Sequence, residues 1–227
     1  MEPVLSIKLA GLVPDTFEPA ANSEIWNHEL ALAVGVFWKL EGPSGSGKTS
    51  LFSFLAGLRR DYSGALLLAT KSDNLELAGC NSQAWSEIRS RHLAFVFQDL
   101  RLIDHLSLQE NLLLKSNLTP ISNRAQELER ICELCGHLEI DRHLKKAARQ
   151  LSRGELQRAA IVRSLLQPFD CLILDEPFSH LDHRLEKMAA NLIARECKNR
   201  SAGAIVLDLQ PDELFPYQSI LGFGGRL

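Results

Sequence analysis

The sequence predicts an α/β fold built on a mainly parallel sheet with helices on its faces. Segments typical of buried strands alternate with amphipathic helices along most of the 227 residues, and this order is the one that places parallel strands in a single sheet. A glycine-rich loop separates one strand from one helix near residue 45, and residues 99–167 contain no strand pattern. We therefore expect one α/β domain with a helical insertion.

The first elements of the chain surround the glycine-rich loop. They are a strand at residues 4–12, a turn-rich loop at 14–23, a strand at 34–40 and a helix at 49–58. The second strand is predicted from a nearly continuous apolar run, which is typical of a strand buried on both faces. The helix is predicted to bury Leu51, Phe52, Leu55 and Leu58 on one face.

The loop between that strand and helix matches the phosphate-binding pattern G-x-x-x-x-G-K-[ST]. It consists of Gly42, Pro43, Ser44, Gly45, Ser46, Gly47, Lys48 and Thr49, followed by Ser50. Its glycines allow successive backbone N–H groups to point into one concavity, at a helix N-terminus whose dipole favours an anion. Lys48 should reach the β- and γ-phosphates of a nucleotide, and Thr49 is placed to ligate Mg²⁺. An ordinary turn before a helix is the alternative interpretation.

Strands and helices continue to alternate after the loop. The predicted strands are residues 63–70, 93–98, 171–175, 204–209 and 217–221, and the predicted helices are 82–91, one from about 107, 127–138, 151–166 and 185–194. Ser107 and Glu110 have the spacing of a capping box, which predicts the start of one helix.

Two carboxylates follow the strand at residues 171–175. Four apolar residues precede Asp175 and Glu176, so these side chains should emerge at the carboxyl end of a buried strand. Asp175 could hold Mg²⁺, and Glu176 could orient and polarise the water that attacks the γ-phosphate. Such a pair could also merely cap a strand end, but a phosphate-binding loop upstream favours the nucleotide site.

Composition limits the classes of function. The net charge of −3 supplies no basic field for nucleic acid or an anionic membrane. No apolar run has the length of a membrane span and no signal peptide pattern opens the chain, so a role in transport would require a partner that crosses the membrane. The five cysteines are scattered, which favours a reducing compartment over a disulfide framework. Cys132 and Cys135 have no second pair at zinc-site spacing, which argues against a metal site.

Two aromatic residues upstream of the loop are candidates to stack on a purine ring. They are Phe17 and Trp26. Phe17 is the preferred candidate, although single aromatic residues are more often part of a core.

Taken together, these motifs make the chain resemble the nucleotide-binding domain of ABC ATPases over nearly its whole length. The family signature, usually L-S-G-G-Q, corresponds to residues 151–155, which read L-S-R-G-E. Gln98 matches the Q-loop, and residues 179–182 match the D-loop. The elements occur in the order and at the spacing of that family.

The resemblance implies a P-loop NTPase core at residues 1–98 and 168–227, with an antiparallel β subdomain at its N-terminal side. Residues from about 99 to 167 would be a helical subdomain that carries the signature. ATP and Mg²⁺ are the implied cofactors. The implied catalytic residues are Glu176, Gln98 and Lys48, and the implied metal ligands are Thr49, Gln98 and Asp175.

Partners are also implied by the resemblance. Two such domains, identical or different, would dimerise head to tail around two ATP molecules. Further nucleotide contacts would then come from the signature and the D-loop, namely Ser152, Gly154, Glu155 and Asp182. A membrane permease would dock near residues 98–108, at the cytoplasmic face of the inner or plasma membrane. Residues 85–111 are most similar to the ATPases of lipoprotein-release, macrolide-export and cell-division transporters.

One position departs from the family pattern. Aligning Glu213 with the family's later acidic residue places Leu209 where the family has a switch histidine. Leucine cannot donate a hydrogen bond to a γ-phosphate, so either hydrolysis is slow or another group substitutes, for which His180 is the only nearby histidine. Arg153 and Glu155 replace the first glycine and the glutamine of the signature and are milder departures.

The leading hypothesis is an ATP-hydrolysing subunit of a membrane transporter. A nucleotide-gated regulatory module with little turnover is the alternative, because the switch histidine is replaced. A soluble DNA-repair or translation ATPase is disfavoured by the acidic charge and by the lack of a coiled coil, a zinc module or a duplicated domain.

Overall fold

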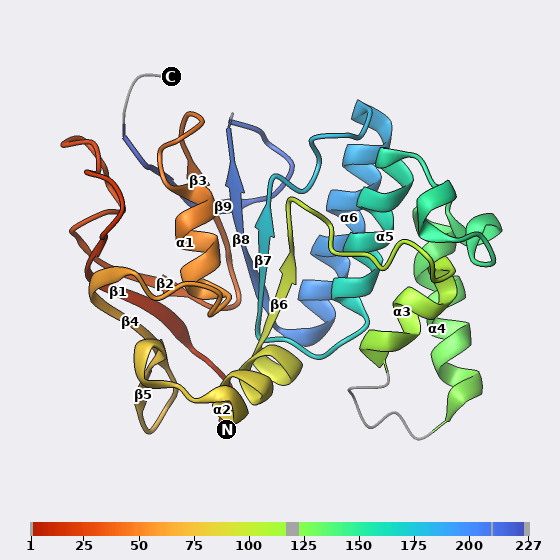
Figure 1. The fold of residues 1–227 in the computed structure, drawn as a ribbon, viewed down its shortest axis with the longest axis horizontal. Coiled ribbons are helices and arrows are strands. Elements are labelled where there is room, and N and C mark those ends of the chain that lie inside the picture. The colour runs from red at the N-terminus through yellow and green to blue at the C-terminus, as the bar shows by residue number, and fades with distance from the viewer. Residues whose placement is uncertain (1, 117–122, 210, 225–227) are drawn as a thin grey trace.

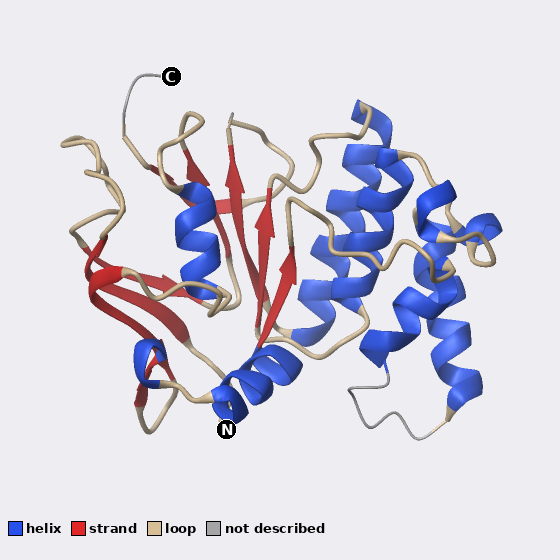
Figure 2. Ribbon diagram, in the orientation of Figure 1, coloured by secondary structure: helices blue, strands red, loops and turns tan. Residues whose placement is uncertain are grey.

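The computed structural model describes residues 2–116, 123–209 and 211–224. Its strands form two sheets, one of five strands in the order β6-β7-β8-β3-β9 and one of four strands in the order β2-β1-β4-β5. Figures 1 and 2 show the four-stranded sheet at one end of the molecule, the five-stranded sheet in the middle and most of the helices at the other end. The predicted α/β class is confirmed.

The five-stranded sheet is parallel throughout. Its strands are β3 (Phe37–Glu41), β6 (Leu93–Val96), β7 (Cys171–Asp175), β8 (Gly203–Asp208) and β9 (Tyr217–Gly222). All five were predicted, with shifts of up to three residues at their ends. Glu41 pairs with Asp208, and Asp175 pairs with Leu207. The loops after β3, β7 and β8 therefore leave the sheet at the same edge.

The four-stranded sheet is antiparallel. Its strands are β1 (Ser6–Pro14), β2 (Glu29–Ala33), β4 (Tyr62–Ala69) and β5 (Asn74–Glu76). The antiparallel β region implied by the family resemblance is thus present at the N-terminal side. Strands β2 and β5 were not predicted, because they have only five and three residues, which is too short for a period-two pattern to stand out.

Helix α1 (Lys48–Leu55) lies between the two sheets. Its buried side chains share one hydrophobic cluster with Leu9 of β1, Leu40 of β3 and Ile173 of β7. The helix ends three residues earlier than predicted, because Gly57 adopts the left-handed conformation (φ +66°). The prediction that Leu58 lies on the buried face of this helix is therefore wrong, since Leu58 follows the helix and is 42% exposed.

Of the remaining helices, α5 (Arg153–Leu165) and α6 (His183–Arg200) pack on the opposite face of the parallel sheet, and α3 (Leu108–Ser116) and α4 (Arg124–His137) pack against α5 on the side away from the sheet. Helix α2 (Ser82–Glu87) continues as a π-helical turn at Ile88–His92 below α1. The predicted capping box of α3 is present, because Ser107 N donates to Glu110 Oε2 (2.8 Å) and Glu110 N donates to Ser107 Oγ (3.2 Å). In the described part of residues 99–167 no strand element occurs.

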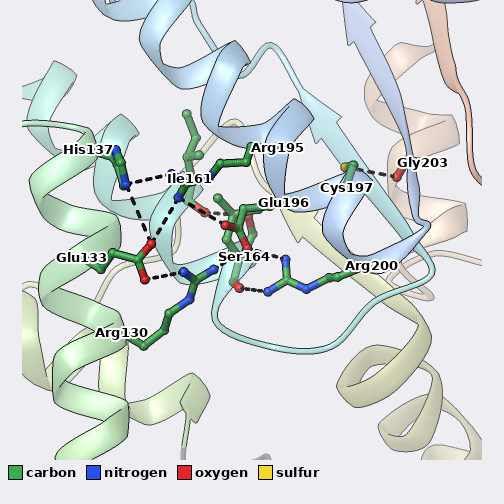
Figure 3. Close-up of polar contacts among 11 residues, drawn as sticks. Arg130, Glu133, His137, Ile161, Ser164, Arg195, Glu196, Cys197, Arg200 and Gly203 are labelled. Atoms are coloured by element: carbon green, nitrogen blue, oxygen red, sulfur yellow. Dashed lines mark hydrogen bonds and ion pairs between the residues drawn. The ribbon is translucent and has the colours of Figure 1, made fainter.

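A buried carboxylate joins α4 to α6 (Figure 3). Glu196 is 2% exposed and pairs with Arg130 of α4, with Arg200 (3.0 Å) and with Arg195 (3.4 Å). Arg200 also donates to the carbonyl of Leu165 at the end of α5 (2.9 Å). This network therefore links three helices through one buried acid.

Glu196→Ala is expected to lower the free energy of unfolding by about 3 kcal/mol, because it removes the buried carboxylate that pairs with Arg200 and leaves Arg130 and Arg195 with the half-exposed Glu133. Urea denaturation followed by circular dichroism measures this change. Glu133→Ala is the matched control, since Glu133 contacts Arg130 (2.6 Å) and Arg195 (3.4 Å) but is 46% exposed, and it should cost less than about 1 kcal/mol. Equal losses in both variants would contradict this account.

Candidate nucleotide-binding site

The predicted phosphate-binding loop connects β3 to α1. Gly45 and Gly47 both adopt the left-handed region, with φ of +82° and +100°, and Gly47 is the N-cap of α1. A Cβ at Gly47 would approach Phe17 Cζ to 2.5 Å and Trp26 Cζ2 to 2.8 Å. Glycine is therefore required at position 47 both for the backbone conformation and for packing.

Lys48 lies inside this loop and is 4% exposed. Its Nζ donates to the carbonyl oxygens of Gly42 (2.6 Å) and Pro43 (2.8 Å). Burial lowers the pKa of Lys48, and the charges of Glu176 and Asp175 oppose that shift. The loop thus holds a partly desolvated cation beside two carboxylates.

A pocket of about 240 Å³ opens in front of the loop. It is lined by Phe17, Ser44, Gly45, Gly47, Lys48, Thr49, Ser50, Gln98 and Glu176. Residues from four separate segments of the sequence therefore meet there, and each of them is among the predicted site residues.

The two aromatic candidates have different surroundings. Phe17 lines the pocket and contacts Trp26 edge to face, with ring centroids 6.0 Å apart. Trp26 is 2% exposed, packs near Phe54 and Phe223, and donates its Nε1–H to Ser46 O (3.1 Å). Trp26 is thus part of the core that supports the loop, and Phe17 is the aromatic side chain available to a ligand.

Asp175 is the last residue of β7 and is 1% exposed. Its Oδ1 atom is buried without a hydrogen-bond partner among the described residues. Burial, followed by the nearby charge of Glu176, raises the pKa of Asp175 to about 7. Such a carboxylate is costly to bury unless a cation neutralises it.

Glu176 has a strained backbone. Its φ of +46° is rare for a residue other than glycine, and such conformations persist where the surrounding structure enforces them. Here the Glu176 N–H donates to Leu207 O of β8 (2.9 Å), and Glu176 Oε2 accepts from Gln98 Nε2 (3.0 Å). The carboxylate is therefore held at the pocket by the neighbouring Q-loop residue, a contact that the sequence pattern did not reveal.

Residues 151–155 open α5 away from this pocket. Ser152 Oγ accepts from Glu155 N (3.3 Å), and Ser152 N donates to Glu155 Oε2 (2.7 Å), which completes a capping box. Glu155 Oε1 also lies 2.9 Å from His143 Nε2. The Glu155 carboxylate is thus engaged at the helix terminus. Gly154 lies close to the D-loop, since a Cβ at this position would come within 2.9 Å of the backbone oxygen of His180.

Asp182 caps α6, since its Oδ1 accepts from Leu185 N (2.9 Å). Together with Ser152, Gly154 and Glu155, it does not line the pocket at Lys48. The two groups of predicted nucleotide contacts are therefore separate within one chain. Arg153 nevertheless connects them, because its Nη2 donates to Gln98 O (3.3 Å).

A second pocket of about 390 Å³ lies on the other side of Glu176. Its lining includes Leu209, which directly follows β8 and is 37% exposed. The position predicted to replace the switch histidine thus borders the same carboxylate. His180 Nδ1 pairs instead with Ser179 Oγ (2.9 Å) and does not line this pocket.

A groove of about 290 Å³ lies beyond the Q-loop. Its lining combines cations with apolar side chains, namely Arg89, Arg101, Arg163, Phe95, Phe97, Ile103 and Leu114, together with Asn111 and Ser164. Ile103 and Leu114 are 39% and 45% exposed. Arg89, Leu114 and Arg163 lie outside the predicted docking segment, and only the fold brings them to the groove.

Comparisons with known proteins agree with this geometry. Residues 26–179 match the family model described as ABC transporter. The chain is 31% identical to the uncharacterised ABC transporter ATP-binding protein YvcR of Bacillus subtilis, over 79% of the chain and 67% of that protein. It is 34% identical to the molybdenum import ATP-binding protein ModC of Paramagnetospirillum magneticum, over 83% of the chain but only 50% of that protein.

The fold also matches solved structures. The dimeric structure of MJ0796, a bacterial ABC transporter cassette, aligns with a TM-score of 0.80 at 24% identity and covers 96% of this chain and 95% of that chain. The same cassette in a post-hydrolysis state bound to ADP and Pi aligns with a TM-score of 0.77 at 25% identity, over 90% of this chain and 88% of that one. Within the described residues, no helix is both long enough and apolar enough to cross a bilayer.

Proposed function

Since the chain belongs to the ABC transporter family of ATP-binding proteins, we propose that it is the ATPase subunit that powers a membrane transporter. The observation that carries the proposal is the pocket in which the phosphate-binding loop, Gln98 and Glu176 meet. A gating module with little turnover is not favoured, because members of this family are ATPases and a similar structure contains ADP and Pi.

In this proposal the chain's own groups bind the triphosphate and activate water. Loop N–H groups and Lys48 hold the β- and γ-phosphates, and Phe17 stacks on the adenine ring. Glu176 orients the attacking water and accepts its proton, while Gln98 fixes the Glu176 carboxylate through their 3.0 Å hydrogen bond. Water activation thus depends on two segments that are in contact.

The residues present also fit Mg²⁺. Asp175 offers a buried oxygen that has no hydrogen-bond partner among the residues described, and Thr49, whose side chain carries a hydroxyl, lines the pocket. Among the described residues no group of three or more His, Cys, Asp or Glu side chains could hold a metal, but Mg²⁺ beside phosphates needs only one or two carboxylates. Thr49, Asp175 and Gln98 would hold the ion, which would neutralise charge on the phosphate oxygens.

The two separated groups of contacts are explained by a dimer. In a head-to-tail pair, Ser152 and Gly154 at the start of α5 face the phosphate-binding loop of the partner, and helix α5 directs its positive end toward the γ-phosphate. Glu155 and Asp182 fix the helix termini on either side of that contact. We place residues 1–98 and 168–227 in the ATPase core and about 99–167 in the helical subdomain, with either an identical or a different domain as partner.

A permease would dock in the groove beyond the Q-loop. The groove presents exposed apolar side chains beside three arginines, so it suits a short segment that carries both an apolar and an acidic residue. Docking there would hold the chain at the cytoplasmic face of the membrane. The proposal does not extend to the lipoprotein-release, macrolide-export and cell-division subgroup, since the relatives named above are an import protein and an uncharacterised one.

Permease-stimulated hydrolysis tests the proposal. The purified chain should hydrolyse ATP, and a permease that co-purifies from membranes should raise kcat. Leu114→Glu should abolish that stimulation because it places a charge in the apolar part of the groove. Leu58→Glu is the matched control, since Leu58 is similarly exposed but lies outside the groove. Absence of turnover with and without the permease would contradict the proposal.

Leu209→His is expected to raise kcat by about tenfold or more, because a histidine beside Glu176 could donate a hydrogen bond to the γ-phosphate as it gains charge. Steady-state phosphate release at saturating ATP measures the change. Leu209→Asn is a control for polarity without an imidazole. An unchanged or lower kcat in the histidine variant would show that Leu209 does not occupy the switch position.

A further inference from the structure

Lys39 is a fully buried charge inside the parallel sheet. It lies in β3, between β8 and β9, and its exposed fraction is 0%. A strand buried in this way usually contains only apolar residues, and a buried ammonium group is costly unless a carboxylate pairs with it. The lysine is visible in the sequence, where it interrupts the apolar run at residues 34–40. The prediction of a buried strand did not assign a role to this charge.

The partner of Lys39 is Asp212, whose Oδ2 atom pairs with Nζ. The other oxygen, Oδ1, accepts from Tyr217 Oη (2.8 Å) and from Leu214 N (2.9 Å). Lys39 Nζ also lies 5.7 Å from the centroid of the Tyr217 ring. Burial and the bond to Asp212 raise the pKa of Tyr217, so its hydroxyl stays a donor. One carboxylate is thus held from β3, from β9 and from its own segment.

Asp212 belongs to the segment that follows β8 and borders Glu176. Leu209, Pro211 and Asp212 line the 390 Å³ pocket together with Glu176. Lys39 precedes Gly42, the first residue of the phosphate-binding loop, by only three positions. The ion pair therefore connects the strand that carries the loop to the segment that borders the base.

We propose that Lys39 is a positioning residue for ATP hydrolysis. Through its ion pair with Asp212 it holds residues 211–216 in place, so that this segment and Glu176 stay in a fixed position relative to the bound γ-phosphate. The inference rests on the proposed ATPase function. Stability alone does not account for the pair, because apolar residues in place of a buried ion pair are often at least as stabilising. A lysine that positions the segment explains why a charge is kept inside the sheet.

Lys39→Met tests the proposal, with Lys8→Met as the matched control because Lys8 lies in the antiparallel sheet and donates to Asn74 (3.1 Å). Loss of the ion pair between Lys39 and Asp212 should lower kcat about tenfold and leave KM for ATP within about twofold, because small displacements at a reacting centre affect turnover more than binding. Hydrogen exchange at the amides of residues 211–216 should be faster in Lys39→Met than in the wild type and the control. Wild-type kcat together with unchanged exchange would overturn the proposal.

A double variant separates positioning from stability. Lys39→Met with Asp212→Asn removes both charges, so it should unfold at a urea concentration similar to that of the wild type and still show the lowered kcat. Recovery of kcat together with stability would mean that the pair is only structural, which would overturn the proposal. If the wild type itself does not hydrolyse ATP, the proposed function fails. The exchange measurement then still reports whether Lys39 holds the segment.

Discussion

Lys48→Ala is expected to weaken ATP binding by at least about a hundredfold, because it removes the cation that should hold the β- and γ-phosphates. The lysine is 4% exposed and lies between the phosphate-binding loop and the two carboxylates that follow β7. Removal of a buried charged partner from a charge-assisted contact costs several kcal/mol. Isothermal titration with ATP and Mg²⁺ measures the affinity directly.

The fold should survive this change, because within the described part of the chain the Lys48 ammonium group donates only to the carbonyl oxygens of Gly42 and Pro43 in its own loop. A urea midpoint close to that of the wild type would establish this. Lys8→Ala, in the antiparallel sheet, serves as the control for loss of one positive charge and should bind ATP as the wild type does. Unchanged affinity in Lys48→Ala would refute the assignment of the loop.

Glu176→Gln is expected to lower kcat by about a hundredfold to ten-thousandfold, the range attributed to general acid–base groups. The amide keeps the shape of the side chain but cannot accept a proton from the attacking water. ATP should still bind, because the phosphate-binding loop and Lys48 are unaltered. The bound nucleotide should therefore hold the chain as a dimer, which size-exclusion chromatography with ATP and Mg²⁺ detects.

Glu76→Gln in the exposed strand β5 is the control for this second variant, and both its turnover and its elution should match the wild type. A Glu176→Gln variant that hydrolyses ATP at the normal rate would show that another group activates the water. A variant that loses turnover and elutes only as a monomer would contradict the head-to-tail arrangement around the nucleotide.

The central part of the site was predictable because local patterns define it. A glycine-rich loop after a buried strand predicts where phosphate N–H donors lie, and Asp175 follows four apolar residues at the end of another strand. Carboxyl ends of parallel strands meet at one edge of a sheet, so proximity of Lys48 to Asp175 and Glu176 follows from the two patterns. The charge interactions among these three residues agree with that expectation.

The parts that were not predictable depend on contacts between distant segments or on single backbone angles. The bond from Gln98 to Glu176 joins two loops, and the pair of Lys39 with Asp212 joins a strand to a loop near the other end of the sequence. Leu58 was misplaced because one left-handed glycine ends α1 early. Periodicity describes one element at a time and contains no information on such pairs.

The neighbours of β3 in the sheet are synthesised long after β3 itself. This strand, at residues 37–41, pairs on one side with residues 204–208 and on the other with residues 217–222. These pairings join segments more than 160 residues apart in the sequence. Such distant pairings delay folding of the sheet, because the entropy cost of closing a long loop must be overcome before the strands pair. During synthesis the phosphate-binding loop is complete long before its strand has neighbours. A nascent chain on the ribosome should therefore gain affinity for nucleotide only after residue 222 has emerged.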